Sequence, residues 1–491
     1  MRPLSRLISG VAASLAVAAC TPKPMPLAQD PGAVEAASCR DLYAAIDAQV
    51  DEAGVGDAQF ARIAGYPYLR IDRFLAADDI KPDPGGNGYA AWVEWLRDSD
   101  LDARSFELQN LPRDAKDALG TAIDSRLQDC SDLLITRDLS SRASQVQLLE
   151  FARVADDYSL AKRIFGLYPF TSLPFNAGVK NLHENMQAEF SRSLGSLPVT
   201  GRLIRYRPPP GSAGLSAEAV RKLLEKAGRD PLGIPNIPLA DLQSLFATFA
   251  PVYEIDVAGD DDRIGAMFWS EDANPSVDVS HPVVYRRVSY TRFEGRTLLQ
   301  LNFSVWFPSR PAEGDFDLLS GRLDGITFRV TLNNDGRPLI YDSMHNCGCY
   351  HLFLPTRRLS RRSPSQGHEE PPLVAQHIVV EQGRAVLRIA HGSHYLQRLY
   401  FDTAIEAGEA YALRDDDSLR SLALANGGRR SLFAPDGLVV GSERGERWLF
   451  WPMGIAEPGA MRQWGRHATA FVGTRHFDDP DLMERYFMSA E

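Results

Sequence analysis

The chain has 491 residues, with 64 acidic and 53 basic side chains and a net charge of −11. Nucleic-acid binding needs a concentrated basic surface, so this balance argues against a nucleic-acid partner. The length exceeds the size at which one hydrophobic core stops growing, and more than one domain is expected.

The first segment has the pattern of an export signal. Arg2 and Arg6 precede an apolar stretch over residues 7–19, which ends in two alanines and Cys20. The stretch is too short to span a bilayer as a stable helix, which predicts a cleaved signal over residues 1–19. The pattern resembles the lipobox of bacterial lipoproteins. That resemblance implies that Cys20 carries acyl chains such as palmitate and becomes the mature N-terminus.

The lipobox also implies a location in the cell envelope. Thr21 follows the cysteine, where enterobacterial lipoproteins kept in the inner membrane usually have aspartate. For a Gram-negative host this predicts the outer membrane, facing the periplasm. Residues 20–35, with four prolines, are predicted to be a lipidated tether. No later run of 18 apolar residues occurs, so the lipid is the only membrane attachment that the sequence implies.

Residues 36–200 are predicted to form a mainly helical domain. Leu42, Ile46 and Val50 recur at helical spacing, and strong strand signals are far apart. We expect the aromatic, proline-containing segment 168–170 to be a turn whose rings pack in the core. Cys39 and Cys130 both fall in this domain, and in an oxidising compartment we expect them to form a disulfide, worth about 4 kcal/mol for a loop of that length.

Residues 201–250 are predicted to be a linker with short helices. Three prolines and a glycine at 208–211 interrupt the helical pattern. Ser216 is a favourable N-cap for a helix that ends near Gly228, and a second helix is expected over 239–249, before Pro251.

Residues 251–491 are predicted to form an antiparallel β-rich domain. Apolar and polar residues alternate from Leu299 to Phe307, the period of a strand with one buried face. Hairpin turns are expected at 294–296, 334–336 and 382–383. The expected fold class is therefore α+β, with a helical N-terminal domain followed by a sandwich or open barrel.

A histidine and cysteine cluster follows one predicted strand. His345, Cys347, Cys349 and His351 occupy alternate positions, so an extended segment would place all four side chains on one face. A second pair, His391 and His394, follows another strand. Such ligands suit zinc or copper, and the six residues form a candidate metal site.

Two other interpretations of the cluster stay open. Cys347 and Cys349 would form a strained disulfide or a redox dithiol across Gly348. Alternatively, the segment is a packed structural turn with ordinary buried histidines. A second polar and aromatic group lies near the C-terminus, where packing is the simpler explanation: Trp448, Trp451, Met453, Met461, Arg462, Trp464, His467, Arg475, His476 and Asp478.

Common enzyme motifs are absent from the sequence. No G-x-S-x-G, H-E-x-x-H, P-loop, G-x-G-x-x-G or C-x-x-C pattern occurs, which removes support for common esterase, zinc-protease, nucleotide and thioredoxin chemistry. The sequence therefore favours a lipid-anchored binding or structural module, with other envelope proteins or glycans as candidate partners. The alternatives are a periplasmic zinc or copper enzyme and a redox protein that uses Cys347 and Cys349.

Overall fold

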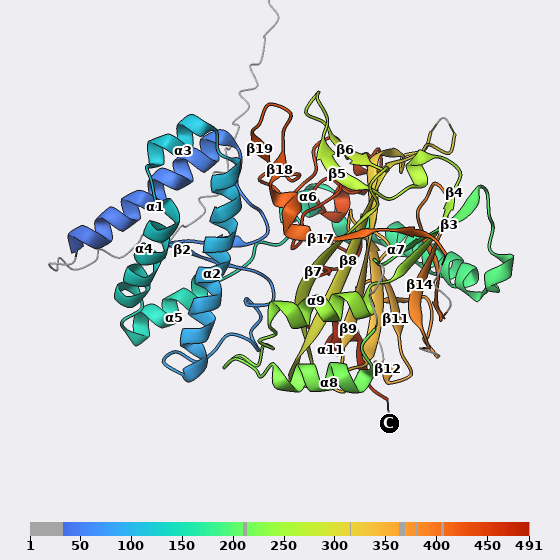
Figure 1. Cartoon of the computed structure of the whole chain (residues 1–491), viewed down its shortest axis with the longest axis horizontal. Coiled ribbons are helices and arrows are strands. Elements are labelled where there is room, and N and C mark those ends of the chain that lie inside the picture. The colour runs from blue at the N-terminus through green and yellow to red at the C-terminus, as the bar shows by residue number, and fades with distance from the viewer. Residues whose placement is uncertain are drawn as a thin grey trace, which may run out of the picture.

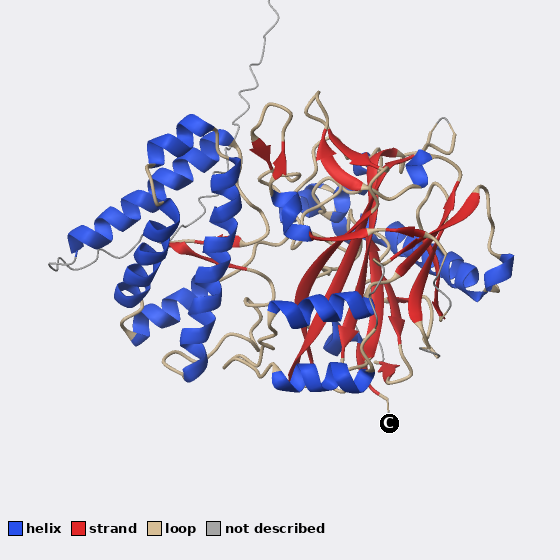
Figure 2. Ribbon diagram, in the orientation of Figure 1, coloured by secondary structure: helices blue, strands red, loops and turns tan. Residues whose placement is uncertain are grey.

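The computed structural model describes residues 33–209, 214–314, 316–362, 369–379, 382–403 and 407–490. Its fold class is α+β, as predicted. The helices before residue 157 gather at one side of the molecule, and the two large sheets lie at the other together with later helices (Figures 1 and 2). We call these parts the helical body, residues 33–157, and the β body, the remaining described residues. Cys20 and the predicted tether up to residue 32 lie outside the described residues.

The helical body packs five helices around a short hairpin. A disulfide joins Cys39 to Cys130, the predicted pairing, and holds the first and fourth helices together with a Cα–Cα distance of 5.3 Å. Trp92 and Tyr43 are fully buried between these elements. The elements are α1 (Ala33–Ala53), β1 (Ala61–Ile63), β2 (Tyr66–Ile71), α2 (Asn87–Asn110), α3 (Arg113–Leu119), α4 (Ile123–Asp138) and α5 (Arg142–Phe151).

The helical body ends earlier than the predicted boundary at residue 200. Helices α6 (Leu160–Phe165) and α7 (Tyr168–Ser191) belong to the β body. Met186 and Phe190 of α7 are buried in its core, and Arg163 of α6 donates to the Met453 carbonyl oxygen. The predicted turn at 168–170 is instead the first turn of α7, where Pro169 is favourable because its missing N–H needs no partner. Helical spacing alone does not say which core a helix joins.

The predicted linker also belongs to the β body. Its first part is strand β3 (Arg202–Arg207), which pairs antiparallel with β4 (Val252–Val257). The two predicted helices are confirmed as α8 (Ala217–Lys226) and α9 (Leu239–Phe249). The Ser216 hydroxyl accepts the Ala219 N–H at 3.2 Å, as expected of an N-cap.

The larger sheet has seven strands, and its centre is antiparallel. The predicted hairpins at 294–296 and 334–336 are confirmed, since they join neighbouring strands of this sheet. The two edge pairs are parallel, so the sheet is mixed. Its order is β13 (Leu373–Val374), β11 (Leu352–Pro355), β10 (Pro338–His345), β9 (Gly321–Leu332), β8 (Arg296–Arg310), β7 (Val283–Phe293) and β17 (Ala412–Asp415).

The smaller sheet has five strands and shows that the third predicted hairpin, at 382–383, is wrong. Strand β13 lies in the larger sheet. The strand that begins after Gly383 lies in the smaller sheet, where it pairs with β4 and with the next strand in the sequence, residues 396–402. Two neighbouring apolar runs thus serve different sheets, which local pattern does not reveal. The order is β15 (Leu396–Asp402), β14 (Arg384–Ile389), β4, β3 and β16 (Glu409–Ala410).

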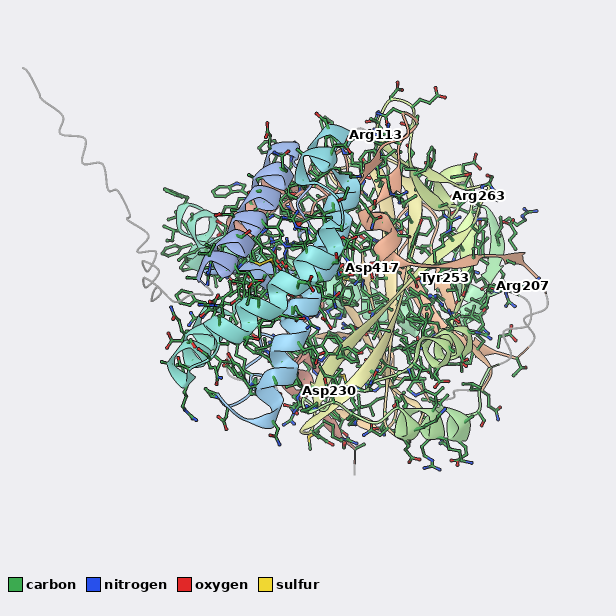
Figure 3. The ribbon with its side chains drawn as sticks, turned by 60° about the vertical axis from the view of Figure 1, so that its left-hand side comes forward. Arg113, Arg207, Asp230, Tyr253, Arg263 and Asp417 are labelled. Atoms are coloured by element: carbon green, nitrogen blue, oxygen red, sulfur yellow. A yellow bond between two sulfur atoms is a disulfide. The ribbon has the colours of Figure 1, made fainter. Side chains whose placement is uncertain are left out.

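The two sheets share one core, with Tyr253 between them (Figure 3). The Tyr253 hydroxyl donates to the Phe303 carbonyl oxygen at 3.3 Å, which links the sheets. Among the described residues no helix is both long and apolar enough to span a bilayer. The smaller elements are η1 (Leu194–Ser196), η2 (Asp260–Asp262), β5 (Ala266–Trp269), β6 (Pro275–Asp278), β12 (Leu359–Arg361), η3 (Asp416–Arg420), β18 (Leu422–Ala423), β19 (Arg429–Arg430), α10 (Arg447–Phe450), η4 (Trp451–Met453), α11 (Leu482–Tyr486) and β20 (Phe487–Ser489).

Candidate functional site

The predicted histidine and cysteine segment forms the turn between β10 and β11. The chain does not stay extended, because the Gly348 N–H donates to the His345 carbonyl oxygen at 2.7 Å and the His345 N–H donates to the Cys349 carbonyl oxygen at 2.9 Å. Gly348 has φ +92°, and a Cβ there would lie 2.4 Å from the Ala468 carbonyl oxygen. Only glycine fits this position without displacing the backbone.

The strand register separates the two histidines of the segment. Ser343 pairs with Leu352, and successive side chains point to opposite faces of a sheet. His345 therefore shares a face with Ser343, whereas His351 lies on the other face with Asp342. The shared face expected for an extended segment does not form.

Beside His345, three histidines and two aspartates form a chain of contacts that is buried except at His391, whose side chain is 33% exposed. Asp324 lies between His345 and His394, 3.5 Å from the Nδ1 atom of His345 and 2.8 Å from that of His394. Asp262 lies between His394 and His391, 3.5 Å from the Nε2 atom of His394 and 2.8 Å from the Nδ1 atom of His391. The structure thus brings together three of the six predicted ligands, each beside a carboxylate.

Burial and neighbouring charges shift the pKa values of these histidines and aspartates in opposite directions. For Asp324, the two flanking imidazoles outweigh burial and hold its pKa well below the usual range. Burial lowers the pKa of His345, and Asp324 only partly offsets it. For His394, burial is outweighed by Asp262 and Asp324, so its pKa is raised. His394 also stacks on Phe307 at 3.9 Å between ring centroids. These contacts between histidines and aspartates link the segments that carry Asp262, Asp324 and His394.

Three residues with strained backbone conformations lie in or next to these histidine and aspartate contacts. Leu323, Tyr350 and His394 have φ values of +57°, +56° and +52°, in the left-handed region that non-glycine residues seldom adopt. Each such residue costs on the order of 1–3 kcal/mol and persists only where its surroundings fix it. Tyr350 follows directly from the turn, so the surroundings that hold its backbone in this region also fix the positions of the Cys349 and Tyr350 side chains.

His351 forms a hydrogen bond with a separate buried ion pair, that of Asp342 and Arg329. Its Nε2 atom lies 2.9 Å from a carboxylate oxygen of Asp342, which also accepts from Arg329. Arg329 stacks on the Phe477 ring at 3.7 Å. Burial lowers the pKa of His351 to about 4, so its imidazole is neutral at neutral pH. This arrangement matches the structural interpretation of that histidine.

The two cysteines of the turn are free thiols in the structure. The Cys349 N–H donates to the Cys347 sulfur at 3.4 Å, and Cys347 is buried. Contact with Cys347, then burial, raises the pKa of Cys349 well above its usual value. A protonated thiol is a poor nucleophile, so this environment gives little support to redox chemistry.

The metal prediction stays a prediction. In the part of the chain that the structure describes, no group of three or more His, Cys, Asp or Glu side chains is arranged to hold a metal ion. The Nδ1 atoms of His345, His391 and His394 lie instead beside carboxylate oxygens of Asp324 or Asp262.

The turn forms the base of an apolar pocket of about 430 Å³, which we call the α7 pocket. Helix α7 supplies one wall, and its Phe175 ring lies 5.4 and 6.5 Å, between centroids, from Phe450 and Phe471, which also line the pocket. Pockets of 300–1,000 Å³ with apolar walls and few polar groups are typical ligand sites. The lining residues are Pro174, Phe175, Gly178, Val179, Leu182, Leu319, Cys349, Tyr350, Glu446, Leu449, Phe450 and Phe471.

Glu446 is the one carboxyl group among the residues that line the α7 pocket. It is only 5% exposed, and burial raises its pKa to about 7 against the attraction of Arg444. At pH 7 about half of it is therefore the uncharged acid, which has one O–H to donate. Such a group suits a carbonyl or hydroxyl oxygen at the end of an otherwise apolar ligand.

Exposed apolar side chains adjoin this pocket on α6, the start of α7, α10 and η4. These elements are in contact: the Arg163 guanidinium of α6 donates to the Met453 carbonyl oxygen of η4 at 2.9 Å, and the Phe175 and Phe450 rings join α7 to α10. Large exposed apolar surfaces mark interaction sites with proteins or membranes. We call the following set the apolar surface: Leu160, Ile164, Phe165, Leu167, Phe170, Leu173, Trp448, Leu449 and Trp451.

Sequence reasoning missed the α7 wall and Glu446. The expectation that the 168–170 aromatics pack in the core is wrong for Phe170, which is 72% exposed. The available signal was the high density of apolar residues at 160–175 without a polar face. Of the C-terminal group, Trp448 and Trp451 are exposed, His467 is buried with its pKa lowered to about 3, and His476 lies between acidic residues of both bodies.

Comparison of this chain with protein-family models, with curated proteins and with solved structures finds no match.

Proposed function

We propose that this chain is a lipid-anchored envelope protein that binds an apolar ligand, an acyl chain or a similar lipid group, in the α7 pocket. The anchor rests on the lipobox resemblance at Cys20. The ligand class rests on the walls of the pocket, where one weakly acidic group stands among aliphatic and aromatic side chains.

The chemistry of the pocket is the observation that carries the proposal. Each methylene group moved from water to such walls contributes about 0.8 kcal/mol. Glu446 in its uncharged form adds a hydrogen bond to a ligand oxygen without placing a charge among apolar groups. A strongly polar or charged ligand would lose its hydration and find few partners there.

The apolar surface supports the same interpretation. Trp448, Trp451 and Phe165 are large rings exposed beside the pocket, and rings of this kind favour the interface of a bilayer. A protein held at a membrane by its lipid would turn this surface towards the bilayer, from which an acyl chain enters the pocket. The metal and redox alternatives lack a comparable observation, because the histidines face carboxylates, and contact with Cys347 and burial raise the pKa of the Cys349 thiol.

Binding of a homologous ligand series tests the proposal. Monooctanoyl-, monodecanoyl- and monododecanoylglycerol are titrated into the full-length protein by calorimetry. Each pair of added methylene groups should strengthen binding about fifteenfold at a stoichiometry of one, until the pocket is full. Absence of saturable binding, or affinity that ignores chain length, refutes the proposal.

A surface variant separates pocket binding from adsorption. Phe165→Ser changes a side chain that is 81% exposed and does not line the pocket. It should leave the monoacylglycerol affinity within about twofold and weaken association with phosphatidylethanolamine vesicles. Equal loss of both would place the lipid contacts on the surface rather than in the pocket.

A further inference from the structure

A second cavity, of about 320 Å³, lies between the helical body and the β body. Figure 3 labels Asp417 and Asp230 along the line where the two bodies meet. Asp230 accepts the Trp95 indole N–H at 2.7 Å, and Asp417 accepts from Arg287 and Arg420. Cavities between domains are favoured positions for ligands. Nothing in the α7 pocket depends on this cavity.

Most of the carboxylates that line the cavity have a cationic partner. Asp417 contacts Arg287 at 2.6 Å, and Asp102 contacts Arg420 at 2.5 Å. Asp98 contacts Arg97 at the surface, and its side chain is 56% exposed. These ion pairs neutralise much of the acidic lining.

Asp72 is the exception, and Asp478 has only a long ion pair. Asp72 accepts a backbone N–H of Leu75 at 2.8 Å and has no ion-pair partner among the described residues. Asp478 lies 3.4 Å from Arg73, which is held more closely by Asp157 at 2.5 Å. Burial, reinforced by Asp478, raises the pKa of Asp72 to about 6. Two carboxylates that disfavour each other's charge would be stabilised by a cation between them.

Two buried oxygen atoms in the lining also lack hydrogen-bond partners. Gln59 is only 6% exposed and its Oε1 atom accepts no hydrogen bond from the described residues; the Oδ1 atom of Asp478, on a side chain 9% exposed, likewise accepts none. Both residues line the cavity. Buried acceptors without donors are rare in folded proteins, and a ligand with N–H or O–H groups would satisfy them.

Aromatic rings form another part of the cavity lining. The Trp95 and Tyr290 rings pack edge to face with 6.5 Å between their centroids. The Arg287 guanidinium lies over the Trp464 ring, 5.7 Å from its centroid. A hard metal ion prefers oxygen ligands throughout, whereas an organic cation is stabilised by carboxylates and ring faces together. The lining therefore selects for an organic cation over a metal ion.

We propose that the interbody cavity binds a small organic cation, a primary or quaternary amine, between Asp72 and Asp478 and against the rings of Trp95, Tyr290 and Trp464. The Gln59 carbonyl oxygen accepts a hydrogen bond from an N–H or O–H of the same ligand. Because the ligand contacts both bodies, its binding holds them together.

Calorimetry with matched probes tests this proposal on the full-length protein. Choline, putrescine and spermidine are compared with 3,3-dimethylbutan-1-ol, the uncharged analogue of choline. At least one amine should bind with a Kd below about 1 mM, and the uncharged analogue should bind at least tenfold more weakly than choline if choline binds. No amine binding, or equal binding of choline and its analogue, overturns the proposal.

Two carboxylate variants locate the site. Asp72→Asn keeps the acceptor for the Leu75 N–H and should weaken amine binding about thirtyfold. Asp98→Asn lines the same cavity at its exposed edge and should change it less than about twofold. Amine binding that Asp72→Asn leaves unchanged overturns the proposal. Equal binding of an uncharged saccharide, N,N′-diacetylchitobiose, to both variants also overturns it. If Asp72→Asn fails to fold, the comparison of choline with its analogue still decides the question.

Discussion

Gly178 offers a direct test of the α7 pocket, because it lines the pocket from the middle of a helix. A Cβ atom built there meets no other atom within 4 Å, so a larger side chain enters free space. Glycine also lowers helix stability by about 1 kcal/mol relative to alanine or leucine. Gly178→Leu should therefore fill the ligand space and at the same time stabilise α7.

The expected magnitudes follow from the geometry. The leucine side chain takes the place of about four ligand carbon atoms, each worth about 0.8 kcal/mol, so affinity for monodecanoylglycerol should fall by about 3 kcal/mol, more than a hundredfold. Gly178→Ala takes the place of about one carbon atom and should cost about fourfold. Both variants should raise the melting temperature by about 1–2 °C.

Calorimetric titration and thermal unfolding by circular dichroism measure the two effects on the same samples. The opposite signs of the changes in affinity and stability distinguish a filled pocket from a damaged protein. If Gly178→Leu raises the melting temperature and still binds the ligand with the wild-type affinity, the ligand does not occupy this pocket and the reasoning is refuted.

Four other results are expected. Because the pKa of Glu446 is about 7, uncharged ligands should bind more weakly as pH rises from 6 to 8, and Glu446→Gln should remove this dependence in the same titrations. Replacing Cys39 and Cys130 by serine should lower the free energy of unfolding by about 4 kcal/mol in urea titrations, and a loss below 1 kcal/mol would contradict the disulfide. Gly348→Ala should lower the melting temperature, since its Cβ would lie 2.4 Å from a carbonyl oxygen at φ +92°, and an unchanged melting temperature would contradict the turn geometry. Asp324 has a folded pKa below its unfolded value near 4, so its contribution to stability is fully present above pH 4 and is lost as pH falls; Asp324→Asn should destabilise the protein at pH 7 and make acid unfolding less steep.

Elements with strong local signals were predictable. The alternation at 299–307 lies in β8, the Ser216 N-cap begins α8, and Pro251 follows the end of α9. These features depend on neighbouring residues, because side-chain period, capping and proline geometry are set within a few positions of the chain. The Cys39–Cys130 pairing was also predictable, since both cysteines fall in the same helical region.

The candidate site was only partly predictable. Of the residues 345–351, Cys349 and Tyr350 line the α7 pocket, whereas His391 and His394 lie beside Asp262 and Asp324. The register of β10 and β11 decides that His345 and His351 face opposite ways, and register is a property of paired strands.

The sequence by itself determined the fold class, most of the helices and strands, two of the three hairpins and the position of one chemically unusual segment. Only the tertiary structure decided which body α7 and β3 join, that Phe170 is exposed, and that Glu446 stands beside Cys349 and Tyr350. The physical reason is range: helical and strand periodicity are written in neighbouring residues, whereas a pocket is formed by segments that lie far apart in the chain and meet only when their cores pack.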